Sequence, residues 1–296
     1  MAGRFSRPDR NDSRALALAR RSGLLAAVAL GFWLGLERPG LAWGRMGHRA
    51  AAKLAESRLS PQARALVREL LEPGESLADA STWADENSRE IPGSASWHYV
   101  NVPVSHDHYS PRDCRPSGCV VSKIGEFRAV LLDPRASRAK KRIALRFLVH
   151  LIEDVHQPMH VADHEDRGGN ALQLRHGRHD ATNLHQLWDS GLLRERYRDE
   201  DELLRELKTL ANGPESRDWR GKSVVHWADE SLALGRQAYL IPDSNTRLRS
   251  GDAVPRSYDR VNTPRAALRL AQAGVRLADV LNEILTDREP GATSPR

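Results

Sequence analysis

The sequence predicts an all-α protein with one mostly helical domain. Apolar residues recur at helical spacing over most of the chain after residue 42, and Ser or Pro stands where several of these segments begin. The chain has 296 residues, of which 40% are hydrophobic, enough for a substantial core. Neither an internal repeat nor an interdomain linker is apparent, so a single domain is the simplest organisation.

Six segments are expected to form helices. One of them has Ser60 as a helix cap and Pro61 in its first turn, a combination typical of a helix start. Pro158 is expected to end or kink another, because proline lacks the N–H that a helix interior needs. The six segments are Gly47–Arg58, Pro61–Leu71, Leu77–Ser88, Ser137–His156, Ser223–Tyr239 and Pro264–Thr286.

The remaining segments are expected to be extended or irregular. Ser96–Pro103 alternates enough to be a short extended piece, and Val104–Val120 is a polar loop. Asp163–Thr182 contains Gly168-Gly169-Asn170 and has room for a short hairpin. A loop of this length in a compact domain is more often functional than not. The polar tail 287–296 is expected to be disordered.

The first 42 residues have the pattern of a secretory signal peptide. Arg20-Arg21 precede an apolar run from Gly23 to Leu36, and Gly40-Leu41-Ala42 offers a small-residue cleavage site. The run is shorter than the ~18 residues of a membrane span. We expect cleavage at Ala42-Trp43, export to the periplasm or the medium, and no stable membrane association afterwards. A signal anchor is the alternative, and the general and twin-arginine export routes both stay open.

Charge and cysteine content are informative only once the signal peptide is set aside. The formal net charge of +6 falls to about +2 after residue 42, so the charge alone says little about nucleic acid. Cys114 and Cys119 are separated by Arg-Pro-Ser-Gly. In an oxidising compartment we expect a small disulfide loop, with two free thiols as the alternative.

Histidines and aspartates recur at a spacing that suits a metal. His150 and Asp154 lie four residues apart in one predicted helix and so share a face, and His185 and Asp189 repeat the spacing. One such pair is commonly a surface ion pair, but two of them, with His160 just after Pro158, indicate a metal site. Imidazole and carboxylate groups without thiolates suit zinc.

Other histidines are not expected to bind metal. His156 ends the same predicted helix but lies off the face of His150 and Asp154, and His226 is expected in packing or at the surface. Five more occur in polar loops, where we expect exposure to solvent: His106, His108, His164, His176 and His179.

Motifs between Trp43 and Leu193 resemble a known family. In order they are Trp43-Gly44 with His48 five residues after the Trp, Trp83-Ala84-Asp85, His98-Tyr99-Val100-Asn101, Phe147–His160, Gly168-Gly169-Asn170, and Asn183–Asp189 with its His-Gln-Leu-Trp-Asp end. Their order and spacing resemble the secreted three-zinc, single-strand-specific nucleases, the S-one/P-one nuclease family. The resemblance implies one helical domain over 43–286, of the phospholipase C and nuclease type, with a cleft for three zinc ions.

The resemblance also implies a ligand set for each Zn²⁺. One ion would take Asp85, His98, His150 and one oxygen of Asp154. A second would take His48, the other oxygen of Asp154, and the α-amino nitrogen and carbonyl oxygen of Trp43, which only cleavage after Ala42 makes available. The third would take His160, His185 and Asp189. Asp85 and Asp154 would thereby be central to catalysis.

The substrate contacts implied by the resemblance are fewer. Asn170 would hold the scissile phosphate, and Tyr99 corresponds to an aromatic residue that stacks a base. Arg89 stands near the place of a family lysine and is the candidate for a second phosphate contact. The implied activity is hydrolysis of single-stranded DNA and RNA to 5′-phosphate products, with 3′-nucleotides as further substrates. We expect a monomer.

Two alternatives remain at this point. A zinc phospholipase C shares the fold and the metal site, but its first His lies further from the N-terminal Trp and Glu ends its last motif, where Asp189 stands here. A non-catalytic secreted zinc-binding protein would leave so complete a ligand set, open toward a phosphate, unexplained.

Overall fold

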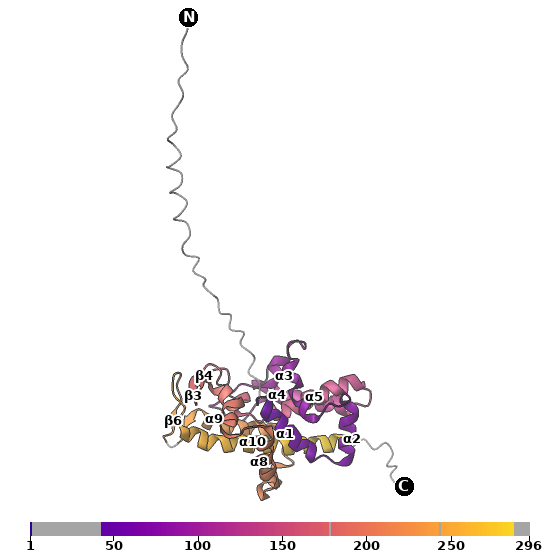
Figure 1. Cartoon of the computed structure of the whole chain (residues 1–296). Helices are drawn as coiled ribbons and strands as arrows, with labels where there is room; N and C mark the ends of the chain where they lie inside the picture. Colours follow the sequence, from indigo (N-terminus) through magenta and orange to yellow (C-terminus); the bar gives the residue numbers. More distant parts are fainter. Residues whose placement is uncertain (2–42, 178, 243, 287–296) are drawn as a thin grey trace, which may run out of the picture. The chain divides into compact units, whose positions relative to one another are not determined.

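Helices occupy the segments where the sequence predicts them. A computed structural model describes Met1 and residues 43–177, 179–242 and 244–286 (Figure 1). Apart from Met1, the predicted signal peptide (1–42) and the predicted tail (287–296) lie outside the described residues. Residues 43–286 lie in one compact unit.

Ten α-helices lie within the described residues. They are α1 (Arg45–Ser57), α2 (Pro61–Leu70), α3 (Leu77–Glu86), α4 (Val120–Leu132), α5 (Arg138–Asp154), α6 (Leu184–Gln186), α7 (Leu192–Arg196), α8 (Glu200–Asn212), α9 (Val224–Ala238) and α10 (Arg256–Thr286). Short 3-10 turns are η1 (Ser94–His98), η2 (Pro111–Asp113), η3 (Pro158–His160) and η5 (Pro214–Trp219), and η4 (Leu187–Gly191) is a π turn.

The strands of the described part are short and form three separate pairs. β1 (Val102–Pro103) runs parallel to β2 (Ala162–Asp163). β3 (Gln173–His176) and β4 (His179–Asn183) form the hairpin for which the sequence left room. β5 (Leu240–Ile241) and β6 (Thr246–Arg247) form the third pair, which is antiparallel.

Side-chain caps explain where several helices begin. Ser60 Oγ accepts the N–H of Ala63 at 3.1 Å at the start of α2. At the start of α3, Ser76 and Asp79 form a reciprocal capping box. Ser137 and Ser223 cap α5 and α9 in the same way as Ser60. Each cap satisfies an N–H that has no partner inside its helix, which explains why these starts agree with the prediction.

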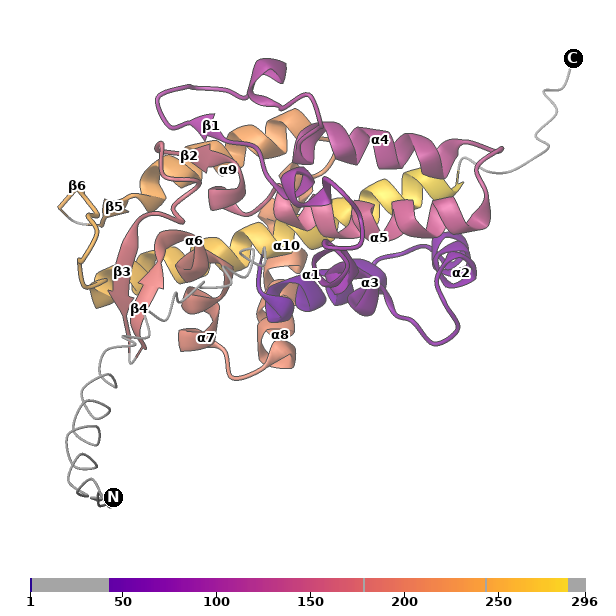
Figure 2. The ribbon, with the colours of Figure 1, turned by 90° about the horizontal axis from the view of Figure 1, so that it is seen from above.

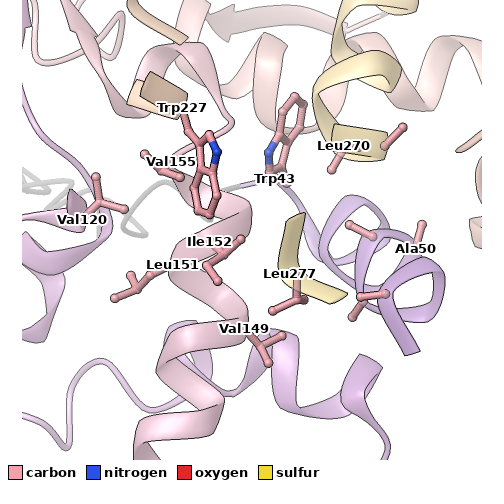
Figure 3. Close-up of a cluster of buried hydrophobic side chains, with 14 of the residues drawn as sticks. Trp43, Ala50, Val120, Val149, Leu151, Ile152, Val155, Trp227, Leu270 and Leu277 are labelled. Atoms are coloured by element: carbon pink, nitrogen blue, oxygen red, sulfur yellow. The ribbon is translucent and has the colours of Figure 1, made fainter. Parts of the chain in front are cut away.

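The core is built around α10. This helix contacts α1, α2, α5, α7 and α8, and α4 lies alongside α5 (Figure 2). At Gly274 a Cβ would lie 2.9 Å from the carbonyl oxygen of Ala51, so α10 can approach α1 this closely only without a side chain there. Figure 3 shows Trp43 in the buried cluster that includes Leu270 of α10 and Ile152 of α5.

A buried ionic network joins α9 to α10. Glu230 accepts hydrogen bonds from Arg269 at 2.6 Å and from Arg276 at 2.5 Å. Burial alone would raise the pKa of Glu230, but the hydrogen bond from Arg276 and the charge of Arg269 outweigh it and lower the pKa to about 2. Arg276 also donates to His156 Nε2 at 2.9 Å, so this histidine is bound within the core, away from the candidate ligands.

Three expectations about the fold were incomplete or wrong. α4, α6, α7 and α8 were not predicted, and α10 begins before Pro264, which lies inside it. Tyr258 holds this first part of α10, because its hydroxyl donates to the carbonyl of Ala238 at 2.6 Å and accepts from Trp188 at 2.9 Å. Ser96–Pro103 is only partly extended, since η1 continues to His98 and extended backbone begins at Tyr99.

Two further observations concern the cysteines and the length and polarity of the helices. Cys114 and Cys119 are joined in a disulfide, so the predicted loop is confirmed over the alternative of two thiols. Among the described residues, every helix is too short or too polar to span a lipid bilayer.

Candidate metal centre

Eight predicted ligands, distant in sequence, converge on one region of the fold. They come from α1 (His48), α3 (Asp85), η1 (His98), α5 (His150 and Asp154), η3 (His160), α6 (His185) and the π turn (Asp189). Their ligand atoms form three groups, each within 4.8 Å: His48, His150 and Asp154; Asp85, His98 and His150; His160, His185 and Asp189. These groups correspond closely to the three predicted ligand sets, with His150 shared between the first two.

The end of α5 forms the centre of the first two groups. His150 Nε2 lies 3.1 Å from Asp154 Oδ2, as the four-residue spacing predicts. His98 Nδ1 lies 2.9 Å from His150 Nε2 and 3.0 Å from Asp154 Oδ2. Asp85 Oδ1 is 3.5 Å from His150 Nε2. These atoms are close enough for one ion to contact all four side chains.

The second oxygen of Asp154 faces a different histidine. Asp154 Oδ1 is 3.5 Å from Nε2 of His48, whose ring stacks on that of His150 with centroids 4.2 Å apart. Each oxygen of this buried carboxylate therefore meets a separate set of imidazole nitrogens. That is the arrangement a carboxylate needs to bridge two cations.

The third group lies around the π turn. His185 Nε2 is 3.5 Å from Asp189 Oδ2, and His160 Nε2 is 3.8 Å from Asp189 Oδ1. The wider π turn carries Asp189, and such turns occur frequently at functional sites. Gln157 Nε2 donates to Asp189 Oδ1 at 2.5 Å, which fixes the orientation of the carboxylate.

Backbone carbonyls fix the orientation of three imidazoles. The Nδ1 atoms of His150, His160 and His185 lie 2.6 Å, 2.7 Å and 2.8 Å from the carbonyl oxygens of Ser81, His98 and Gly168 respectively. A carbonyl only accepts, so each Nδ1 must carry the hydrogen. The lone pair is then left on Nε2, the nitrogen that points into the group. Metal-binding histidines are commonly held by such outer hydrogen bonds.

Buried polar atoms without a partner mark where cations would sit. Among the described residues, His48 Nε2, Asp154 Oδ1, His160 Nε2 and Asp189 Oδ2 are buried with no hydrogen-bond partner. An unsatisfied buried polar group is costly and rare. All four of these atoms belong to the three groups, so a metal ion would satisfy them. His98 differs from the other histidines, because Nδ1 is the nitrogen that faces the group. Its Nε2, on the outer side of the ring, has no hydrogen-bond partner.

Burial and neighbouring charges shift the pKa values of several candidate ligands. Burial lowers the pKa of His48, and that of His185, to about 3, so both imidazoles are neutral at neutral pH. Burial alone would raise the pKa of Asp154, but His150 and His160 outweigh it and hold the pKa well below its usual value. Burial raises the pKa of Asp189 well above its usual value. A cation beside Asp189 would stabilise its ionised form.

The Gly-Gly-Asn loop packs directly against the third group. Gly168 and Gly169 both have positive φ, 62° and 83°, and a Cβ on Gly168 would lie 2.5 Å from the Met159 carbonyl oxygen. Only glycine can therefore place its carbonyl beside His185. Asn170 follows, and its Nδ2 donates to the carbonyl of Arg167 at 2.9 Å.

The other predicted substrate residues lie differently. Tyr99 follows His98 directly and is half-buried, with the guanidinium of Arg115 5.9 Å from its ring centre. Arg115 belongs to the loop that the disulfide closes. Arg89 is exposed in the turn after α3, and it is not part of the three groups.

Sequence reasoning missed two residues and misplaced one. Glu153 and Gln157 contact predicted ligands, although no spacing in the sequence identifies them. His176, expected in solvent, is buried because its Nε2 bonds Asp259 Oδ1 on α10 at 2.8 Å. In the sequence, Leu174 stands between polar Gln173 and Arg175, and the two-residue period of a strand would place His176 on the same face as Leu174.

Comparison with known proteins decides the family. The S1/P1 nuclease family model matches residues 43–286. This chain belongs to the S1/P1 nuclease family. Nuclease P1 of Penicillium citrinum is 31% identical over 82% of this chain and 97% of its own length. Endonuclease 2 of Arabidopsis thaliana is 29% identical over 90% of this chain and 99% of its own. Nuclease S1 of Aspergillus oryzae is 33% identical over 51% and 54% respectively.

Membership confirms the predicted family, the helical fold and the assignment as an enzyme. An S1/P1 nuclease is a hydrolase of phosphodiester bonds, and its substrates are nucleic acids. The nuclease interpretation is thus favoured over both the phospholipase and the non-catalytic alternatives. The matched region begins at Trp43, the residue expected to follow the signal peptide.

Proposed function

We propose that this S1/P1 nuclease is a zinc-dependent endonuclease that cleaves single-stranded DNA and RNA to 5′-phosphate products and also dephosphorylates 3′-nucleotides. The observation that carries the proposal is the position of Asp154. Its two oxygens face separate groups of imidazole nitrogens, 3.1 Å from His150 and 3.5 Å from His48. Such a buried carboxylate, with imidazole nitrogens near both of its oxygens, suits zinc among the common biological metals.

The first and third metal sites follow from the groups already described. Asp85, His98, His150 and Asp154 would hold one ion, and His160, His185 and Asp189 would hold another. Zinc at these sites would supply positive charge for an anionic phosphodiester and lower the pKa of bound water toward neutrality. Asp85 and Asp154 would then orient the reacting centre.

The second site would include the N-terminus that processing creates. His48 and Asp154 supply two ligands, and the α-amino nitrogen and carbonyl oxygen of Trp43 would supply the others. Trp43 is fully buried, and its Nε1 donates to the Glu153 carbonyl at 3.0 Å. The next N–H, of Gly44, donates to the Asp189 carbonyl at 2.7 Å. The backbone of Trp43 is thus fixed between two segments that carry predicted ligands.

Asn170 and Tyr99 would contact the substrate beside these sites. Asn170 uses Nδ2 to hold Arg167, but an amide has two N–H groups and the second can donate to a phosphate oxygen. Tyr99 would stack on a base that has left its partner. Unstacking a paired base costs a few kcal/mol, so single strands would be preferred. Arg89, which is exposed, remains our candidate for a further phosphate contact.

Changing Tyr99 to Ala is expected to weaken binding of single-stranded DNA by about 1–3 kcal/mol, the usual value of one lost stack. The measurement is the affinity for a phosphorothioate oligonucleotide that is cleaved slowly. Tyr99→Phe is the control, since it keeps the ring and should bind nearly as the wild type. If Tyr99→Ala binds with unchanged affinity, the ring serves packing alone.

A substrate panel tests the proposed function as a whole. Single-stranded DNA, matched duplex DNA, a 3′-nucleotide and phosphatidylcholine are offered to protein that begins at Trp43. We expect fast cleavage of the single strand, release of phosphate from the 3′-nucleotide and slow cleavage of the duplex. Fast hydrolysis of phosphatidylcholine with little DNA cleavage would instead support the phospholipase alternative.

We also propose that the protein is exported and that it has the following domain limits. Residues 1–42 would be a signal peptide, residues 43–286 the nuclease domain, and residues 287–296 a tail outside that domain. The disulfide between Cys114 and Cys119 agrees with an oxidising destination, periplasmic or extracellular. The mature enzyme would act as a monomer.

A further inference from the structure

Glu153 is a fully buried carboxylate beside the candidate metal centre. It lies on α5, directly before Asp154, and none of its surface is exposed. Its Oε2 is 2.5 Å from Nδ1 of His48, which lies on α1, 105 residues earlier in the chain. Burying a carboxylate is costly unless it is paired, so this contact is a specific feature of the site.

His48 is held differently from the other histidines that point into the groups through Nε2. For His150, His160 and His185 the outer nitrogen meets a backbone carbonyl. For His48 it meets a carboxylate. An ionised carboxylate forms a stronger hydrogen bond than a carbonyl and makes the imidazole a better ligand. An ionised Glu153 can only accept, so in this pairing the hydrogen lies on Nδ1 of His48 and the Nε2 lone pair is left toward Asp154.

The geometry makes Glu153 a partner of a ligand and not a ligand itself. Its Oε2 lies on the outer side of the His48 ring, whereas the ligand nitrogen Nε2 lies on the inner side, 3.5 Å from Asp154 Oδ1. Glu153 belongs to none of the three groups of potential ligands in the described residues. Its other oxygen, Oε1, has no hydrogen-bond partner.

The backbone of Glu153 contacts the other half of the predicted second site. Its carbonyl oxygen accepts the indole N–H of Trp43 at 3.0 Å. One residue of α5 therefore contacts both the ring of His48 and the side chain of Trp43. These are the two residues that would join Asp154 in the second site.

We propose that Glu153 is a positioning residue for the second metal site, holding His48 with Nε2 toward Asp154 while its carbonyl anchors Trp43. The inference rests on the proposed function, because it needs a metal bound by His48. It predicts that loss of the carboxylate selectively lowers the affinity for one of the three ions. Loss of an outer partner of this kind typically weakens metal binding about 10–100-fold.

The test compares zinc affinities of full-length mature protein carrying Glu153→Ala, Glu153→Gln or Asp259→Ala. Asp259→Ala is the matched control, since it also removes the carboxylate partner of a buried histidine, His176, and neither residue belongs to the three groups. Glu153→Gln keeps an oxygen that can accept from His48 Nδ1. Zinc per folded chain is measured over a series of buffered free zinc concentrations, with circular dichroism as the check on folding.

We expect Glu153→Ala to bind two ions as the wild type does and the third about 10–100-fold more weakly. Glu153→Gln should recover part of this loss, and Asp259→Ala should leave all the affinities unchanged. Should Glu153→Ala not fold, Glu153→Met, which keeps the side-chain length without an acceptor, carries the same comparison.

Two results would overturn the inference. In one, Glu153→Ala and Glu153→Met hold every ion as tightly as the wild type. In the other, the affinity for every ion falls and the zinc-free chain also loses stability, which would make Glu153 only structural. Failure of the proposed function is distinguishable, because then the wild type itself would bind no ion at His48 or would not cleave single-stranded DNA.

Discussion

Asp154→Asn is expected to reduce kcat/KM for single-stranded DNA on the order of 10³-fold or more, the rate equivalent of about 4 kcal/mol. The two oxygens of Asp154 face different groups of histidines, 3.0 Å from His98 and 3.5 Å from His48. An amide replaces one oxygen by an NH₂ group that cannot bind a cation, and it removes the negative charge. Two metal sites would therefore be damaged by one substitution.

Asp189→Asn is the matched control. Asp189 is also buried and also faces histidines, but both of its oxygens serve a single group, at 3.5 Å from His185 and 3.8 Å from His160. We expect a smaller loss, about 10–100-fold, with one ion lost instead of two. Kinetics and zinc content are measured on the same preparations. Equal and mild losses in the two variants would contradict the bridging position of Asp154.

Residues placed before Trp43 are expected to abolish most of the activity. An α-amino group has a lone pair for a metal, whereas an extended chain has an amide nitrogen at that position, which has none available. Metal ligands must present a free lone pair, so the second site would be incomplete in the precursor. Because Trp43 is buried and bonded through its indole to Glu153, the chain has little freedom to supply another nitrogen nearby.

The experiment compares protein that begins at Trp43 with protein that carries a short extension ending in a protease site. Both are refolded with zinc and assayed on single-stranded DNA. The extended form should be nearly inactive and should gain activity when the protease exposes Trp43. A chain with the same extension after Thr286 controls for the added residues. Equal activity of the extended and processed forms would refute the proposed N-terminal ligand.

Local spacing predicted much of the centre. The four-residue steps from His150 to Asp154 and from His185 to Asp189 place each pair on one face, and the structure has both pairs at 3.1–3.5 Å. Serine caps likewise predicted helix starts, as at Ser60. These features depend on neighbours within one helical turn, which a single sequence displays directly.

Contacts between distant segments could not be predicted in the same way. Glu153 meets His48 across 105 residues, and no local pattern marks that pair. The start of α10 before Pro264 depends on Tyr258, whose hydroxyl bonds Ala238 and Trp188. Such tertiary contacts override local preference, because burial and hydrogen bonding outweigh the cost of proline in the helix.

The central claim is that one chain binds three catalytic zinc ions, and zinc content measured alongside activity tests it most directly. Zinc-free protein beginning at Trp43 is titrated with zinc, and bound metal and cleavage of single-stranded DNA are followed together. We expect activity to rise with occupancy and reach its maximum at three ions per chain. Full activity in a chain that holds one ion or fewer would contradict the account.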